Sequence, residues 1–126
     1  MKLIITTDKA PRPKGPYSQA VIHNGVIYVS GMGPVDAETG RIIRGTIEEE
    51  TKTTLENIKG ILQEAGSGMS HVLKVSCFLS DMNDFENFNN VYREYFPSES
   101  PARTTIQAGK LPMDIKVEID CIAAIE

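Results

Sequence analysis

The segment from residue 20 to residue 30 restricts the fold of this chain more than any other stretch. It reads Ala-Val-Ile-His-Asn-Gly-Val-Ile-Tyr-Val-Ser, so Asn24 and Gly25 separate two runs rich in β-branched residues. An Asn-Gly pair favours the two-residue turn of an antiparallel hairpin, because both turn positions need a positive φ. We therefore predict two strands joined at this turn.

Two helices are predicted outside this hairpin. The first follows Thr46, which has the capping-box spacing to Glu49, and Gly66 is placed to end it. The second is expected to begin at residues 83–86 by the same capping logic and to end before Pro97. Both carry an apolar stripe at helical spacing, which is typical of a helix that covers a sheet on one side. The first stripe comprises Ile47, Leu55, Ile58, Ile61, Leu62 and Ala65, and the second comprises Phe85, Phe88, Val91, Tyr92 and Tyr95.

Further strand signals complete an α+β arrangement. Residues 2–6 are expected to form a short first strand, and residues 72–79 form another between the two helices. This order of elements predicts a mixed β-sheet with two helices packed on one face. A chain of 126 residues suits a single domain covering residues 1–126.

Residues 101–120 are interpreted as a second hairpin. β-Branched residues are enriched in residues 104–107 and 116–123, and the segment between these runs carries Gly, Pro and Asp. We place the centre of the loop near Leu111 and Pro112. The sequence thus predicts that the last two strands pair with each other.

That register brings charged residues together. It sets Arg103 opposite Asp120 and Thr105 opposite Glu118, and directly opposed residues share a face of the sheet. The polar face would be an ion-paired, solvated surface or the wall of a binding cleft, and the residues alone leave both interpretations open. The other face would be apolar, with Thr104, Ile106, Val117, Ile119 and Cys121.

Composition narrows the classes of function. A formal net charge of -4 argues against a surface that tracks nucleic-acid phosphates. Cys77 and Cys121 lie in apolar strands, which favours buried thiols in a reducing, cytoplasmic setting, and no hydrophobic signal or membrane segment is evident at the start of the sequence. His23 and His71 have no Cys or acidic partner at the spacing of a metal site, so no metal is expected.

Several motifs, in one order along nearly the whole chain, resemble the Rid/YjgF family of enamine and imine deaminases, also called the L-PSP endoribonuclease family. Pro-Ala-Arg, a strand, a Leu-Pro loop and Val-Glu-Ile form the most specific part of the resemblance. The motifs are Gly15-Pro16-Tyr17-Ser18-Gln19-Ala20, Ile27-Tyr28-Val29-Ser30-Gly31, Asp84-Phe85 with Asn89, Pro101-Ala102-Arg103, Leu111-Pro112 and Val117-Glu118-Ile119.

The resemblance also implies an assembly. The sheet face without helices would carry Val26, Tyr28 and Phe78, and a bare apolar face of this kind predicts oligomerisation. Resemblance to the family specifies a homotrimer of chorismate-mutase-like subunits, whose sheets surround a central barrel and whose clefts lie between subunits. It implies a 2-iminobutanoate/2-iminopropanoate deaminase that hydrolyses reactive imines to 2-oxo acids and ammonia without a cofactor.

The same resemblance assigns the binding residues. Arg103 would grip the substrate carboxylate with two parallel hydrogen bonds, a geometry that lysine does not reproduce. Ser30 and the backbone of Gly31 would complete this anchor, and Tyr17 would close the cleft from a neighbouring subunit. Asn89 matches a family position on the second helix, where it either faces the pocket or is a solvent-facing or capping amide.

Glu118 and Thr105 complete the expected catalytic group with Arg103. The Glu118 carboxylate would position water at the C=N carbon and move a proton to the departing nitrogen. A structural ion pair with Arg103 is compatible with that role. Thr105 stands where many relatives have cysteine. If the family residue acts through its bulk and backbone, threonine preserves the deaminase, whereas a requirement for thiol chemistry would exclude it.

Two other functions are compatible with these residues. One is a regulatory protein that binds small carboxylates such as 2-oxo acids, for which Arg103 would suffice and Glu118 would not be needed. The other is the endoribonuclease or translation-inhibitor activity reported for some relatives. The negative net charge and the absence of a basic stripe with interleaved aromatic residues disfavour the latter.

Overall fold

The computed structural model describes residues 1–125, and it contains the predicted Asn-Gly hairpin. β2 (Ala20–His23) and β3 (Val26–Met32) pair antiparallel on either side of the turn. Asn24 and Gly25 have φ values of 50° and 74°, the left-handed conformation that such a turn needs. β1 (Leu3–Ile5) pairs antiparallel with β2, which confirms the short first strand.

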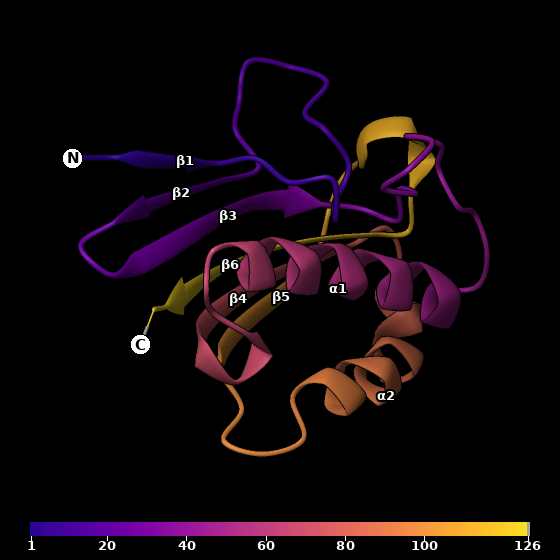
Figure 1. Ribbon diagram of the computed structural model, residues 1–126. Helices are drawn as coiled ribbons and strands as arrows, with labels where there is room; N and C mark the ends of the chain where they lie inside the picture. The colour runs from indigo at the N-terminus through magenta and orange to yellow at the C-terminus, as the bar shows by residue number, and fades with distance from the viewer. Residues whose placement is uncertain (126) are drawn as a thin grey trace.

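One six-stranded sheet runs through the molecule in the order β1-β2-β3-β6-β4-β5 (Figure 1). Its second half consists of β4 (Val72–Leu79), β5 (Ala102–Gln107) and β6 (Val117–Ala124). β6 lies between β3 and β4 and is antiparallel to both, whereas β5 is parallel to β4. The sheet is therefore mixed, as the sequence predicts.

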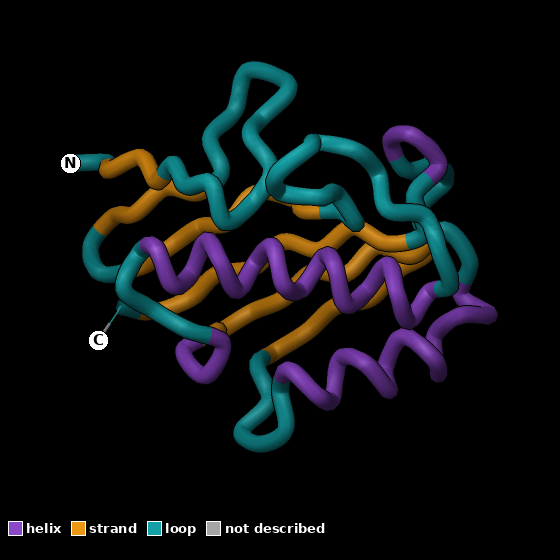
Figure 2. Tube along the Cα trace, turned by 45° about the vertical axis from the view of Figure 1, so that its right-hand side comes forward, coloured by secondary structure: helices purple, strands orange, loops and turns teal. Residues whose placement is uncertain are grey.

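Two helices, α1 (Ile47–Glu64) and α2 (Phe85–Tyr95), lie side by side on one face of this sheet (Figure 2). Short 3-10 turns precede β4 at Met69–His71, precede α2 at Met82–Asp84 and precede β6 at Pro112–Asp114. Within residues 1–125, no helix combines the length and the apolar character needed to cross a membrane. The α+β architecture with helices on one face is confirmed.

The two helices begin differently. The capping box of α1 is confirmed, because the Glu49 N–H donates to the Thr46 hydroxyl at 3.2 Å and the Thr46 N–H donates to Glu49 Oε1 at 2.8 Å. The predicted capping of α2 is wrong, because its first residue follows Asp84, whose side chain makes no capping bond. The capping side chain is Asp81, which accepts a hydrogen bond from the Asn83 N–H at 2.9 Å at the start of the preceding 3-10 turn.

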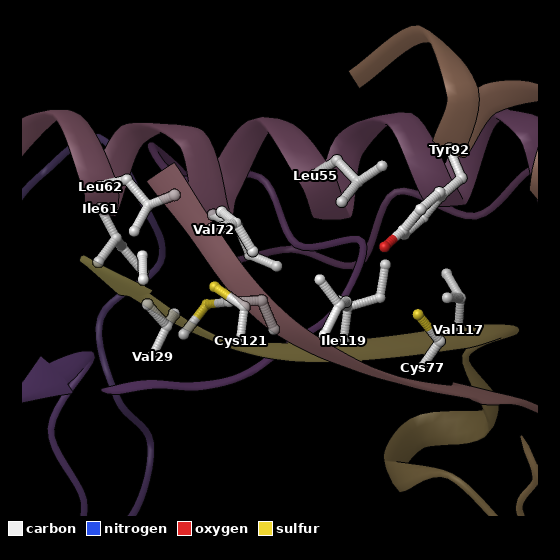
Figure 3. Packing of buried hydrophobic residues seen from close by; sticks show 14 of the residues in the cluster. Val29, Leu55, Ile61, Leu62, Val72, Cys77, Tyr92, Val117, Ile119 and Cys121 are labelled. Carbon is white, nitrogen blue, oxygen red and sulfur yellow. The ribbon is translucent and has the colours of Figure 1, made fainter. Parts of the chain in front are cut away.

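The core fills the space between the helices and the sheet (Figure 3). Leu55, Ile61 and Leu62 of α1 pack above Val29 and Ile119 of the strands, and each is no more than 5% exposed. Burying one such side chain stabilises the fold by about 1.5–3 kcal/mol. β4 and β6 contribute every second residue to this face, namely Val75, Cys77, Leu79, Val117, Ile119 and Cys121.

The opposite face of the sheet carries no helix in residues 1–125. Tyr28 and Ile106 are 47% and 48% exposed there, and Phe78 is half-buried. Solvent-exposed apolar side chains on an open sheet are the kind of surface that another protein chain usually covers. The trimer remains a prediction that this surface supports.

The predicted hairpin of residues 101–120 is wrong. β5 and β6 do not pair, because β4 lies between them and binds β5 on one side and β6 on the other. The long connection through Pro112 does not make a tight turn but carries the chain across β4. The physical reason is that β5 pairs with one edge of β4, so the other edge of β4 is free to pair with β6. β6 then lies between β3 and β4, and the backbone groups on both of its edges are hydrogen-bonded.

Candidate active site

The observed pairing of β4 with β5 and β6 decides which side chains share a face of the sheet, and it differs from the predicted pairing. Val75 pairs with both Arg103 and Cys121, so the Arg103 side chain projects toward the helices. Phe78 pairs with Glu118, which places the glutamate on the open face. The predicted pairs of Arg103 with Asp120 and of Thr105 with Glu118 are therefore wrong, as are the predicted polar and apolar faces. In one chain the guanidinium and the carboxylate lie on opposite sides of the sheet.

Arg103 lies half-buried between β5 and α2. Its Nη1 donates to Asn89 Oδ1 at 2.8 Å, and its guanidinium carbon lies 4.6 Å from the centre of the Tyr92 ring. The rings of Phe85 and Phe88 lie 5.6 and 5.8 Å away. Aromatic faces attract a cation and restrict its rotation. Asn89 thus lies beside Arg103, which is one of the two alternatives expected for it, and its bond leaves other guanidinium donors free to bind an anion.

A depression of about 300 Å³ opens beside this arginine, and we call it the Arg103 pocket. Its wall joins one side of α2 to the segment that leads into β5. The lining residues are Asn89, Tyr92, Arg93, Ser100, Pro101 and Arg103. Two guanidinium groups and two neutral polar side chains make it a place for a small anion.

Thr105 follows Arg103 on the same face and pairs with Cys77 of β4. Its hydroxyl is buried and has no hydrogen-bond partner within residues 1–125 that satisfies normal geometry. Burial raises the pKa of the neighbouring Cys77 thiol to about 12, so this thiol is not a nucleophile at neutral pH. This side of the site therefore has no reactive thiol, because residue 105 is threonine and the Cys77 thiol stays protonated.

Glu118 lies at a second site, on the open face above the end of β3. The pairing of β3 with β6 is irregular between Val29 and Met32, and Gly31 lies in that irregularity. A Cβ built on Gly31 would come within 2.7 Å of Glu118 Oε2, so the carboxylate occupies the space that a side chain would need. The two residues lie in direct contact, a relationship that the sequence did not predict.

A cavity of about 140 Å³ lies next to this carboxylate, and we call it the Glu118 pocket. Tyr17 lies at its edge and is 52% exposed. Apart from Arg12, which pairs with Asp8, and Lys14, which donates to the Gly40 carbonyl, most of the other walls are apolar, so the pocket offers one carboxylate beside a surface for a hydrocarbon group. The lining residues are Pro11, Arg12, Lys14, Tyr17, Gly31, Met32, Gly33, Val35, Ile42, Pro112, Met113, Ile115 and Glu118.

The electrostatics of Glu118 suit proton transfer. Burial raises the pKa of this carboxyl above its usual 4.5, and the negative charge of Asp120 raises the pKa further. Burial also raises the pKa of Asp120, against the hydrogen bond from Ser76 and the charge of Lys74, which lower it. A carboxylate with a raised pKa binds a proton more tightly than an ordinary one, which suits a general base.

Ser30 has a structural task in this chain. Its hydroxyl donates to the Ser18 carbonyl at 2.6 Å, and its N–H donates to the Gln19 carbonyl at 3.0 Å. These bonds hold the Tyr17 segment against β3. Ser30 therefore lies near the Glu118 pocket, on the other side of the sheet from Arg103, and does not complete an anchor with Arg103 in the same chain.

Gln19, Asn57 and Glu50 are buried polar residues that the sequence predictions missed as supports of the site. Gln19 Nε2 donates to three carbonyl groups, which lie 2.9 to 3.2 Å away in the segment from residue 7 to residue 11. Asn57 and Glu50 extend from α1 toward the walls of the Glu118 pocket. Periodicity could have found Glu50, because it lies three residues after Ile47 and four before the buried Thr54.

Comparisons with known proteins agree with this fold. Residues 7–125 match the model of the family described as Endoribonuclease L-PSP. A RutC family protein of Pyrococcus abyssi is 48% identical over 122 residues, which are 97% of this chain and 96% of the relative. A 2-iminobutanoate/2-iminopropanoate deaminase of Bos taurus is 44% identical over 123 residues, which are 98% of this chain and 90% of the relative.

Solved structures give the same result. A protein of Thermotoga maritima superposes with a TM-score of 0.97 at 44% identity, covering 100% of this chain and 99% of the other. TdcF of E. coli, solved with bound serine, superposes with a TM-score of 0.92 at 35% identity, covering 98% of this chain and 99% of the other. That structure shows a small amino acid bound to a protein of the same fold.

Proposed function

Because the chain belongs to the Endoribonuclease L-PSP family, which is the Rid/YjgF family, we propose that it is an imine deaminase that hydrolyses 2-iminobutanoate and 2-iminopropanoate. The observation that carries this proposal is the division of the site. One pocket offers guanidinium groups to an anion, and the other offers a carboxylate with a raised pKa beside an apolar wall. A small 2-imino acid needs both kinds of group.

The two pockets would combine across a subunit interface. Arg103 and Glu118 lie on opposite faces of the sheet in one chain, so the Arg103 pocket of one copy would meet the Glu118 pocket of the next. The open, partly apolar sheet face provides a surface for that contact. A closed homotrimer would then contain three equivalent clefts, each built from two chains.

The residues would divide the chemistry between them. Arg103, held by Asn89, binds the substrate carboxylate, and Tyr17 covers the substrate side chain. Glu118 accepts a proton from a water molecule as the water oxygen bonds to the C=N carbon. That proton moves to the nitrogen, which gives a carbinolamine. A second proton then passes through Glu118 from the new hydroxyl to the nitrogen as the C=O bond forms and the C–N bond breaks, and the products are ammonia and a 2-oxo acid. Thr105 contributes bulk and backbone beside Arg103, since its hydroxyl is buried.

A trapping experiment tests the proposal. An amino-acid oxidase generates 2-iminobutanoate or 2-iminopropanoate, and semicarbazide traps whatever is not hydrolysed. The wild-type protein is expected to reduce trapping, Arg103→Ala is expected not to, and Arg41→Ala serves as a control because Arg41 is exposed and lines neither pocket. Undiminished trapping with the wild-type protein would reject the deaminase.

A binding protein for small carboxylates is the alternative that the same experiment separates. Glu118→Gln is expected to abolish imine hydrolysis and to leave the binding of 2-oxobutanoate intact, because the Arg103 pocket is unchanged. If the wild-type protein binds 2-oxobutanoate without hydrolysing imines, the Arg103 pocket serves ligand binding alone.

A further inference from the structure

Glu50 is a buried carboxylate that takes no part in the chemistry proposed above. Its side chain is 1% exposed, and all three of its donors lie outside α1. Oε1 accepts the backbone N–H of Lys116 at 2.9 Å, and Oε2 accepts the N–H of Gly45 at 3.2 Å and lies 3.3 Å from Lys116 Nζ. A buried carboxylate is costly unless such donors satisfy it, and here they tie α1 to two other segments.

The bond to the Lys116 N–H fixes the backbone just before β6, the strand that carries Glu118. The Lys116 carbonyl accepts a hydrogen bond from the Ser80 N–H at 3.0 Å, so the peptide groups on both sides of this residue are held. Lys116 lies two residues before Glu118 and directly after Ile115, which lines the Glu118 pocket. A displacement of the backbone at Lys116 would therefore move both the carboxylate and the wall of its pocket.

Neighbouring polar contacts hold the rest of the same pocket. Asn57 Nδ2 donates to the carbonyl groups of Gly33 at 3.2 Å and Val35 at 2.8 Å, which fixes the wall after β3. Arg44 Nη2 donates to the Met113 carbonyl at 2.9 Å, which fixes the 3-10 turn. Figures 1 and 2 show the start of α1, the end of β3 and this turn at one end of the sheet.

We propose that Glu50 is a positioning residue, which holds Glu118 at its place above Gly31 through the backbone of Lys116. Glu118 is in contact with Gly31, so a small shift of β6 changes where the carboxylate can place a water molecule. The carboxylate of the substrate would be bound by Arg103 of the other half-site, which Glu50 does not touch. Loss of Glu50 should then affect kcat and leave KM nearly unchanged; this kinetic consequence rests on the proposed deaminase function.

Four variants test the proposal by hydrogen exchange and by kinetics. In Glu50→Ala, the amides of residues 115–118 should exchange at least about tenfold faster, because their local opening costs less, and those of β2 and β3 should be unchanged. We expect kcat to fall by about tenfold to a hundredfold, with KM within about threefold of the wild-type value. Glu50→Gln keeps one oxygen for the Lys116 N–H and should recover part of both losses.

The other two variants are controls. Lys116→Met keeps the backbone N–H but removes one of the three donors to the buried Glu50 carboxylate, so its effects on exchange and on kcat should be smaller than those of Glu50→Ala. Ile61→Val weakens the packing at the opposite end of α1 without touching the pocket.

If Ile61→Val lowers kcat as much as Glu50→Gln does, or if the amides of residues 115–118 exchange at the wild-type rate in Glu50→Ala, the positioning role is rejected. Should the wild-type protein hydrolyse no imine, the function fails and the exchange comparison still decides the role of Glu50.

Discussion

Gly31 lies directly against the carboxylate of Glu118, and a Cβ at this glycine would be 2.7 Å from Oε2 and 3.1 Å from Cδ. This distance is too short for two non-bonded atoms, so Gly31→Ala must displace the carboxylate. The carboxylate has room to move toward the open side of the sheet. We predict that kcat falls by about a hundredfold, as expected when a reacting group is misplaced by about 1 Å. Steady-state hydrolysis of imine generated by an oxidase measures this loss.

Gly109→Ala is the matched control for this change. Nothing lies within 4 Å of a Cβ at Gly109, so the same substitution there should leave kcat unchanged. A Gly31→Ala protein that keeps the wild-type kcat would show that Glu118 does not act from the position seen in the structure.

Arg103→Lys tests whether the guanidinium, and not simply a positive charge, binds the substrate. Lysine cannot form two parallel hydrogen bonds with a carboxylate and cannot keep the same contact with the Tyr92 ring. Loss of one charge-assisted hydrogen bond is worth about 1.5–3 kcal/mol, so KM should rise by about tenfold to a hundredfold. The effect on kcat should be smaller.

Arg41→Lys is the control, since it makes the same chemical change at an exposed arginine outside both pockets. Equal KM values for wild-type protein and Arg103→Lys would mean that only the charge matters at Arg103.

Local sequence signals predicted most of the fold, because each depends on neighbouring residues. The turn at Asn24 and Gly25 needs only two residues with positive φ, and the capping box needs only Thr46 and Glu49. The hairpin of residues 101–120 failed because the position of β6 depends on β4, a strand about forty residues away in the chain. Nothing in the two runs themselves shows that a third strand separates them.

The site was predicted as a set of residues but not as an arrangement. The sequence motifs identified Arg103, Glu118 and Gly31, and the structure places each of them in a pocket wall. The predicted pairing set Arg103 level with Asp120, and so put Arg103 and Glu118 on one face. In the structure Arg103 is level with Cys121, and an offset of one residue exchanges the two faces of a strand. The correct register places them on opposite faces, and this separation is the reason for proposing a cleft between subunits.

Asp120→Asn should change the pH dependence of the reaction. The charge of Asp120 raises the pKa of Glu118, so its removal should lower that pKa, although burial would keep it above 4.5. Glu118 acts as a base in its ionised form, and kcat should therefore rise with pH through the pKa of this group. We predict that the acidic limb of the pH profile moves to lower pH in Asp120→Asn.

The measurement is kcat from pH 4 to 8 with the uncatalysed rate subtracted, and the same scan on Ser76→Ala is a useful comparison. Ser76 lowers the pKa of Asp120 through a hydrogen bond, so its loss makes Asp120 protonate more readily. Ser76→Ala should thus shift the limb in the same direction as Asp120→Asn but less. An acidic limb that stays in place in both variants would mean that another group titrates.

Mixing two inactive variants tests whether each cleft contains residues of two chains. Arg103→Ala and Glu118→Gln should each be inactive, since each removes one half of every site. In any trimer that contains both variants, about a third of the clefts would receive an intact Arg103 from one chain and an intact Glu118 from its neighbour. Co-expression with two affinity tags, followed by purification through both, yields mixed assemblies whose activity can be compared with that of the wild type. If Arg103 and Glu118 of the same chain served one site, no cleft in such an assembly would be intact, and the mixture would be as inactive as either variant alone.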